Sequence, residues 1–383
     1  MIQNRSKRSF SSLCPLCLCG GTFLFFIFFS GCANTEKTVK ADIQPEPRRY
    51  QIAVLPMENL SGTTAPLRDM RLALISGLKD RGVNVLGEQT LEKFMAKYRV
   101  RYVGGIDRVI AEGINKETGT QAILLTSLEL YSDRNPPKIA LVSRLVSATS
   151  KPVILWIDGV GLAGDDSPGI LGLGLIEDPK ALLKKALNTL QDSFLRYLSG
   201  KEGVESVKSP KKKFQPKIAY RSQVIDPEGK YTVAVVPFFN SSVRKYGGEI
   251  MVLHFINELK KIKNLEIIEP GEVRQQFLTL RMIMDEGISL ANADLLFSTL
   301  QADLIVSGKV LDYQDYQGGW GEPRVDFSVL VIEKKSREVV WSSSSYGKGN
   351  DGVFFFDVGR VNTAYVMASQ MAQAIGELIL KGK

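Results

Sequence analysis

The sequence has few of the residues on which metal and redox chemistry depend. All four cysteines lie near the start of the 383-residue chain, at Cys14, Cys17, Cys19 and Cys32. Because we expect that segment to be a targeting signal, the Cys14-x-x-Cys17 spacing is not interpreted as a metal or redox site. The only histidine is His254. A zinc site or a serine–histidine pair would have to use it, so we expect it to be a partly buried structural residue.

The sequence also has no large excess of positive charge on its folded part. The net charge is +8, of which Arg5, Lys7 and Arg8 contribute three charges. The segment 199–230 has eight basic and four acidic residues, so it contributes four more. The remaining chain is close to neutral, which argues against a broad basic face for nucleic acid.

No apolar run near the start is long enough to span a bilayer. The run at residues 22–29, TFLFFIFF, is shorter than the ~20 residues that a spanning helix needs. It is followed by Phe29-Ser30-Gly31-Cys32, which resembles the lipobox of bacterial lipoproteins. The resemblance implies a signal peptide at 1–31, a lipid on Cys32 that attaches the chain to a membrane, and a tether at 32–49. Ala33, rather than an aspartate, follows the cysteine, and by resemblance to the sorting rule of Gram-negative lipoproteins this favours the outer membrane. A plain secretory signal or an uncleaved anchor is the alternative.

One stretch occurs twice. The segment 51–61, QIAVLPMENLS, returns as 232–242, TVAVVPFFNSS, so that Pro237 follows Pro56 by 181 residues (237 − 56). Each apolar run predicts a strand buried on both faces, and the proline ends it because it has no N–H to donate. An internal repeat of this length predicts a duplicated unit. We therefore expect domains at 50–198 and 231–383, separated by a basic linker at 199–230.

The sequence pattern of each unit predicts strands and helices in the order β-α-β-α-α-β-β-β-α. In the first, the hairpin is expected at 138–147 and 151–157, and a closing helix at 178–198. In the second, the hairpin is expected at 325–332 and 338–342, with Trp341 in the place of Trp156, and Gln301-Ala302 in the place of Gln121-Ala122. The fold class is α/β (α+β): two tandem mixed-sheet domains with helices packed on the sheet.

The two IAVLP-x-x-N-x-S motifs, the QAILLTS and ADLIVSG strands, the hairpin and the closing helix resemble the curli-secretion lipoproteins and the amino-terminal domain of the Tol-system periplasmic protein. The resemblance covers most of both halves. It implies a binding or assembly protein, and it transfers no catalytic motif.

A glycine motif formally matches a dinucleotide-binding fingerprint. Gly159-x-Gly161-x-x-Gly164 follows an expected strand, but Asp165 and Asp166 come next instead of the helix that the fingerprint requires. We therefore expect a flexible loop here, no cofactor, no metal and no enzymatic activity.

Two loops have more apolar residues than a solvated loop needs. The candidate partner-binding residues are Phe354, Phe355, Phe356, Ile170, Leu171 and Leu173. The loops are expected at 159–176 and 347–359, and core packing is the alternative interpretation for the phenylalanines. The basic run Lys211, Lys212 and Lys213 is expected to be solvated linker, with an anionic surface as the alternative.

Together these features predict an outer-membrane lipoprotein that faces the periplasm and acts as a non-catalytic binding or assembly module. Its envelope partner is not identifiable from the sequence, and a homo-oligomer is possible. The alternative is an oligomeric secretion-channel subunit. That function would need long alternating membrane hairpins, which the two loops do not show. An envelope enzyme is disfavoured by the single histidine.

Overall fold

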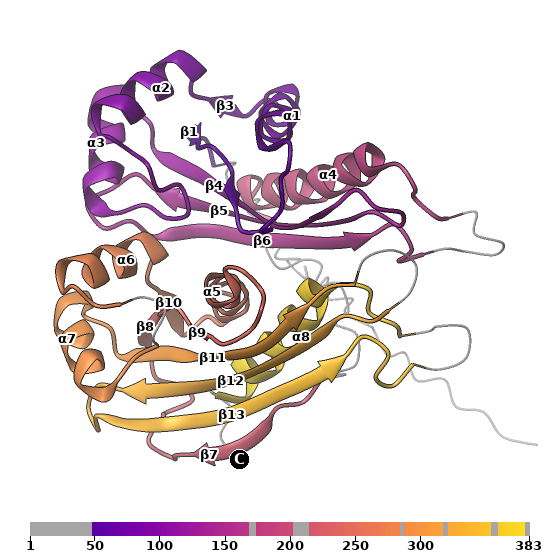
Figure 1. Ribbon diagram of the computed structural model, residues 1–383. Coiled ribbons are helices and arrows are strands. Elements are labelled where there is room, and N and C mark those ends of the chain that lie inside the picture. The colour runs from indigo at the N-terminus through magenta and orange to yellow at the C-terminus, as the bar shows by residue number, and fades with distance from the viewer. Residues whose placement is uncertain are drawn as a thin grey trace, which may run out of the picture. The chain divides into compact units, whose positions relative to one another are not determined.

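The computed structural model describes residues 48–167, 174–201, 214–283, 287–316, 321–353 and 359–379. Residues Gln44–Lys383 form one compact unit, shown in Figure 1. Within the described residues this unit contains eight helices and two mixed sheets. The predicted fold class is therefore confirmed, whereas the independence of two domains stays a prediction.

The first half contains one sheet and four helices. Its elements are β1 (Gln51–Val54), β2 (Glu58–Asn59), α1 (Leu67–Asp80), β3 (Asn84–Val85), α2 (Glu88–Lys97), α3 (Arg108–Thr118), β4 (Ala122–Ser132), β5 (Lys138–Ser147), β6 (Ile154–Ala163) and α4 (Pro179–Leu198). The strand order is β3-β1-β4-β5-β6, with β2 on β4. Strand β1 is parallel to β3 and β4, and β4, β5 and β6 are antiparallel.

The second half repeats this arrangement and adds one strand. Its elements are β7 (Lys217–Arg221), β8 (Tyr231–Val235), β9 (Phe239–Asn240), α5 (Gly247–Leu259), β10 (Leu265–Ile267), α6 (Pro270–Thr279), α7 (Leu290–Leu300), β11 (Leu304–Gln314), β12 (Arg324–Glu333), β13 (Glu338–Lys348) and α8 (Ala364–Ile379). The order is β10-β8-β11-β12-β13-β7. Strand β7 lies in the segment that the sequence predicted as linker.

The turn after the first strand is the same in both halves. Asn59 Oδ1 accepts a hydrogen bond from the Ser61 N–H at 3.0 Å, and Asn240 Oδ1 accepts one from the Ser242 N–H at 3.1 Å. The tryptophans also match, because each is paired directly before a register shift between the last two strands of the hairpin. These pairs support the predicted duplication.

One predicted correspondence is wrong by two residues. Gln121 Oε1 accepts a hydrogen bond from the Gln51 N–H at 2.9 Å, and the counterpart is Asp303 Oδ2, which accepts from the Thr232 N–H at 2.8 Å. Gln301 instead ends α7 in the left-handed conformation. The side-chain acceptor that fixes the first strand is therefore Gln121 in one half and Asp303 in the other.

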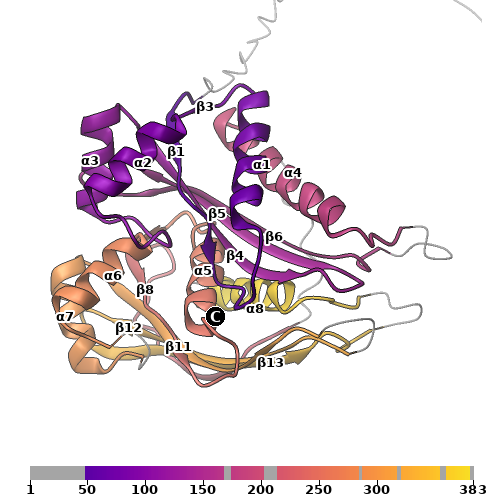
Figure 2. The ribbon, with the colours of Figure 1, turned by 45° about the horizontal axis from the view of Figure 1, so that its top comes forward.

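The two halves share one hydrophobic core. Helices α1 and α4 cover one face of the first sheet, and α6 and α7 cover one face of the second. Helices α5 and α8 pack on the second sheet and also on the remaining face of the first, so they lie between the sheets (Figure 2). The first half is thus covered on both sides of its sheet.

The burial patterns of corresponding strands differ between the two halves. The first nine residues of β5 are all buried, whereas buried and partly exposed residues alternate along most of β12. A strand covered on both faces is a continuous apolar run, and a strand covered on one face alternates. The two halves therefore have the same topology but different solvent exposure.

Candidate functional site

The residues that the sequence predicted as sites lie outside the described part of the structure. They are Cys32, Phe354, Phe355, Phe356, Ile170, Leu171 and Leu173, and the basic run at 211–213 lies outside it as well. The structure does describe the segments that enter and leave the two apolar loops. We refer to these as the loop stems, residues 163–167 with 174–176 and residues 348–353 with 359–362.

The loop stems begin with the same turn in both halves. The Ala163 N–H donates to Asp166 Oδ2 at 2.8 Å, and the Lys348 N–H donates to Asp351 Oδ2 at 2.7 Å. In each case a carboxylate three residues ahead accepts the backbone N–H at the end of the strand. The chain direction at the loop entrance is therefore fixed in the same way twice.

A glycine follows each of these strand ends because the returning chain passes close to it. A Cβ on Gly164 would lie 2.1 Å from the Ile176 carbonyl oxygen, and a Cβ on Gly349 would lie 2.3 Å from the Val361 carbonyl oxygen. No side chain fits at such distances. The third glycine of the apparent dinucleotide motif thus has a structural reason that involves no ligand.

A polar cluster joins the two loop stems, and it is buried at Lys138, Tyr316 and Asn362. Asn362 Nδ2 donates to the Asp165 carbonyl at 3.3 Å and to Asp166 Oδ1 at 3.2 Å. Lys138 Nζ donates to the carbonyls of Asn362 and Tyr316, each at 3.1 Å, and lies 3.0 Å from the centre of the Tyr316 ring. The stem of one loop is therefore bonded to the stem of the other.

Burial shifts the proton affinities in this cluster. It lowers the pKa of Lys138 to about 8, opposed by Asp315, Asp165 and Asp166. It also raises the pKa of Asp315 and of Asp166 above the usual carboxyl range. Because the carbonyls of Asn362 and Tyr316 hold the Lys138 ammonium, the cluster acts as a junction rather than as an open acid–base site.

The first two glycines of the apparent dinucleotide motif lie inside strand β6, so the prediction of a flexible loop starting there is wrong. A Cβ on Gly159 would lie 2.0 Å from Tyr365 Oη, and a Cβ on Gly161 would lie 2.3 Å from Tyr365 Cδ1. Tyr365 belongs to α8 in the other half. These glycines make room for an aromatic ring, and not for a pyrophosphate.

His254 is more deeply buried than the sequence predicted, with 1% of its surface exposed. Its Nδ1 lies 3.0 Å from Ser369 Oγ, and its Nε2 lies 3.2 Å from Glu129 Oε1 and 3.3 Å from Tyr313 Oη. Tyr313 also donates to Glu129. The histidine therefore joins α5 and α8 to the first sheet through a buried hydrogen-bond network.

Other charged groups join the halves, and the sequence analysis missed them. Arg144 and Glu269 are fully buried and pair at 3.2 Å, and Glu269 Oε1 also accepts the Ile106 N–H at 3.2 Å. Arg244 Nη1 donates to the Ser61 carbonyl at 2.6 Å. An arginine within an apolar strand is a signal that a buried partner exists, but the sequence does not reveal that partner.

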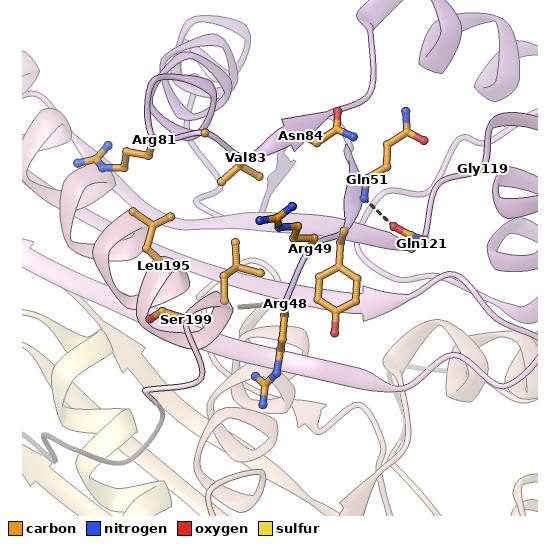
Figure 3. Close-up of a pocket in the computed structure, with 13 residues that line it drawn as sticks. Arg48, Arg49, Gln51, Arg81, Val83, Asn84, Gly119, Gln121, Leu195 and Ser199 are labelled. Atoms are coloured by element: carbon orange, nitrogen blue, oxygen red, sulfur yellow. Dashed lines mark hydrogen bonds between the residues drawn. The ribbon is translucent and has the colours of Figure 1, made fainter. Parts of the chain in front are cut away.

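A cavity of about 810 Å³ lies beside the start of β1 (Figure 3) and has three arginines in its wall. Arg48 Nη1 donates to the Tyr197 carbonyl at 3.1 Å, and Arg81 Nη1 donates to the Gly77 carbonyl at 3.2 Å. Both bonds satisfy carbonyls in the last turns of helices. Figure 3 shows the guanidinium groups of Arg48 and Arg81 pointing in different directions. These two side chains therefore do not form a joint anion site.

The described residues contain neither a metal-binding cluster nor a membrane-spanning helix. No group of three or more histidine, cysteine, aspartate or glutamate side chains there has a geometry that would hold a metal ion. No helix in the same residues has the length and apolar character needed to cross a membrane.

No protein-family model matches the chain, and no curated protein matches it. Solved structures resemble parts of it. The PelC dodecamer from Paraburkholderia phytofirmans is 17% identical over 44% of this chain and 99% of that chain, with a TM-score of 0.30. Lipoprotein GNA1162 from Neisseria meningitidis is 17% identical over 38% and 98%, with a TM-score of 0.28. The LpoB C-terminal domain from Salmonella enterica is 17% identical over 31% and 86%, with a TM-score of 0.26.

Likeness at this level carries no argument about function. The finer resemblance to the curli-secretion lipoproteins stays a prediction.

Proposed function

We propose that this chain is a lipid-anchored lipoprotein of the bacterial envelope, placed in the outer membrane and facing the periplasm, that acts as a non-catalytic binding or assembly module. The lipobox-like sequence that ends at Cys32 supports the anchor. The polar tether at 32–49 would separate the lipid from the folded unit.

The observation that carries the binding role is the junction between the loop stems. Asn362 and Lys138 bond the stem of one loop to the stem of the other, so both apolar loops leave the folded unit at neighbouring points. Exposed apolar clusters tend to mark interaction sites. Two apolar segments held at neighbouring points would offer a partner a larger surface than either alone.

The position of His254 supports a function without catalysis. A general base must reach the proton that it removes from a substrate. His254 is buried and contacts Ser369, Glu129 and Tyr313, so no substrate reaches it without opening the core. The proposal therefore assigns no reaction to this chain.

The loop proposal is tested by replacing Phe354, Phe355 and Phe356 with serine and measuring in-cell crosslinking from the first loop. We expect partner capture to be lost and the melting temperature to be unchanged. Val243→Ser is the control, because Val243 is an apolar residue with 88% of its surface exposed outside both loops. A collapsed melting transition in the triple variant would show instead that the phenylalanines are core, since each buried Phe lost costs ~3 kcal/mol or more.

The anchor is tested separately with Cys32→Ser. Stable membrane attachment needs more than one acyl chain, and a lipoprotein cysteine carries several. We expect the variant to be unprocessed or to move to the soluble periplasmic fraction. Normal processing together with unchanged membrane association would contradict the anchor, and would leave the loop proposal untouched.

A further inference from the structure

The end of the first strand in the first half is filled by an arginine. Arg71 of α1 donates from Nη2 to the Val54 carbonyl at 2.7 Å and from Nε to the Leu55 carbonyl at 3.1 Å. Its guanidinium also pairs with Glu88 at 2.5 and 2.8 Å. The crevice at the carboxyl end of β1, between α1 and α2, is thus occupied by a cation that satisfies strand carbonyls.

The Val54 carbonyl needs a side-chain donor because the neighbouring strand has already ended. Along β1 the Ile52 carbonyl accepts from the Leu86 N–H at 2.8 Å. Alternate carbonyls of a strand point to the same side, so Val54 is the next one on that side. At this point the chain has left β3 and entered α2, and Arg71 supplies the missing donor.

The second half has the same strand end without the arginine. The Val233 carbonyl accepts from the Ile268 N–H at 2.9 Å, so the next carbonyl on that side is Val235. After Ile268 the chain enters α6 at Pro270, and a proline has no N–H that could donate to the Val235 carbonyl. Helix α5, the counterpart of α1, contains no lysine or arginine.

A cavity of about 520 Å³ lies at this strand end. Its volume is within the ~300–1,000 Å³ of ligand pockets. The carboxyl end of the strand at which the sheet order reverses is the usual ligand position in such sheets. The apolar wall consists of Leu60, Val235, Pro237, Tyr246, Val252, Leu253, Pro270 and Val273.

Carboxylates outnumber bases in the cavity wall, where Glu58 and Glu249 are the two carboxylates and Arg274 is the one base. Burial raises the pKa of Glu58, opposed by the hydrogen bond from Ser127 and by the nearby Arg144 and Arg274, and a bound cation would further favour the charged carboxylate. The Arg274 guanidinium lies 4.2 Å from the centre of the Tyr102 ring. Glu58 Oε2 accepts from Ser127 Oγ at 2.7 Å, which holds that carboxylate in place.

We propose that this cavity binds an alkylguanidinium group, in the position that Arg71 has in the first half. The apolar wall suits the methylene chain of an arginine, and Val235 and Glu58 supply the carbonyl and carboxylate that a guanidinium prefers. The source is either an arginine side chain of a partner polypeptide or a free arginine derivative. None of the residues in this cavity wall belongs to the apolar loops, and the test depends on neither the loops nor the anchor.

The test uses the purified full-length protein and three probes followed by calorimetry. The probes are agmatine, N-acetyl-arginine amide and N-acetyl-citrulline amide, which is the neutral isostere. We expect at least one guanidinium probe to bind about tenfold or more tightly than the citrulline probe, because charge-assisted hydrogen bonds are stronger than neutral ones. Binding of the arginine amide indicates a polypeptide source, and binding of agmatine alone indicates a small molecule. Equal binding of citrulline, or no binding of either guanidinium probe, overturns the proposal.

Two variants locate the site. Glu58→Gln keeps an oxygen for Ser127 and removes the charge, so we expect about a tenfold loss of affinity. Val252→Arg places a guanidinium on α5 at the cavity wall and should abolish probe binding while the melting temperature is retained. Glu228→Gln, at an exposed position outside the cavity, is the matched control. If Val252→Arg does not fold, Glu58→Gln decides alone, and unchanged affinity in that variant overturns the proposal.

Discussion

The buried ion pair between Arg144 and Glu269 makes a quantitative prediction about how the halves are held together. Both side chains have no exposed surface, and the nearest atoms are 3.2 Å apart. Glu269 also accepts the Ile106 N–H, and Arg144 donates to the Gly104 carbonyl. The pair is therefore the centre of a network that joins β5 of one half to Glu269, the residue directly before α6 of the other.

We expect each single variant, Arg144→Met or Glu269→Met, to lower the free energy of unfolding by about 3–5 kcal/mol. Removing one partner leaves the other charge buried and unpaired, which is what makes the loss large. The double variant removes both charges of the pair and leaves the Ile106 N–H and the Gly104 carbonyl without those partners, at about 1–3 kcal/mol each. Its cost should be close to that of one single variant, and well below the sum.

The measurement is urea denaturation followed by circular dichroism and tryptophan fluorescence. Lys151→Met is the control, because Lys151 pairs with Glu266 across the halves with 77% and 50% of the two side chains exposed. An exposed pair of this kind contributes at most about 1 kcal/mol. Single-variant losses that add up in the double variant to within about 0.5 kcal/mol would refute the coupling, and single losses as small as that of the control would refute the burial argument.

Two further predictions concern the packing between the halves. Gly161→Ala should lower the free energy of unfolding by about 1–3 kcal/mol, because its Cβ would overlap Tyr365, and adding Tyr365→Leu should recover part of the loss in a thermal melt; a Gly161→Ala protein as stable as wild type would contradict this. Burial lowers the pKa of Lys138 to about 8, below its value near 10.4 in the unfolded chain, so between these values the unfolded state binds more protons and stability should rise with pH. Lys138→Met should remove that rise when urea midpoints are compared between pH 7.5 and 9.5, and an identical pH profile in the two proteins would count against it.

The strands that the sequence predicted best are those whose signal is local. Pro56 and Pro237 follow apolar runs that are buried in both halves, and the duplication follows from the sequence alone. Strand β6 extends beyond its predicted end. The prediction ended it early because Gly159 and Gly161 favour a loop by local propensity. The reason for those glycines is Tyr365, about 200 residues away, and no local pattern contains it.

The site was less predictable than the fold. The sequence pointed to two apolar loops, and the structure describes only their stems, so the binding role of Phe354 to Phe356 stays a prediction. The bonds between the stems involve Lys138 and Asn362. No pattern in the sequence around either residue indicates that the two are in contact. The cavity at the end of β8 has no local sequence signal, because what marks it is the lack of an arginine in the position that Arg71 has in the first half.

The unequal burial of β5 and β12 has a consequence for self-association. The halves stack head to tail, and an interface of that kind leaves the same surface open on the last unit, so that it extends into rings or fibres. The positions of Ala140 and Val142 on β5, which α5 and α8 cover, correspond through the strand registers to Asp326 and Ser328 on β12. A further unit docking there would have to strip water from a carboxylate and a hydroxyl. At these two positions the second half therefore presents a more polar face than the first half does, and this opposes the docking of a further unit there.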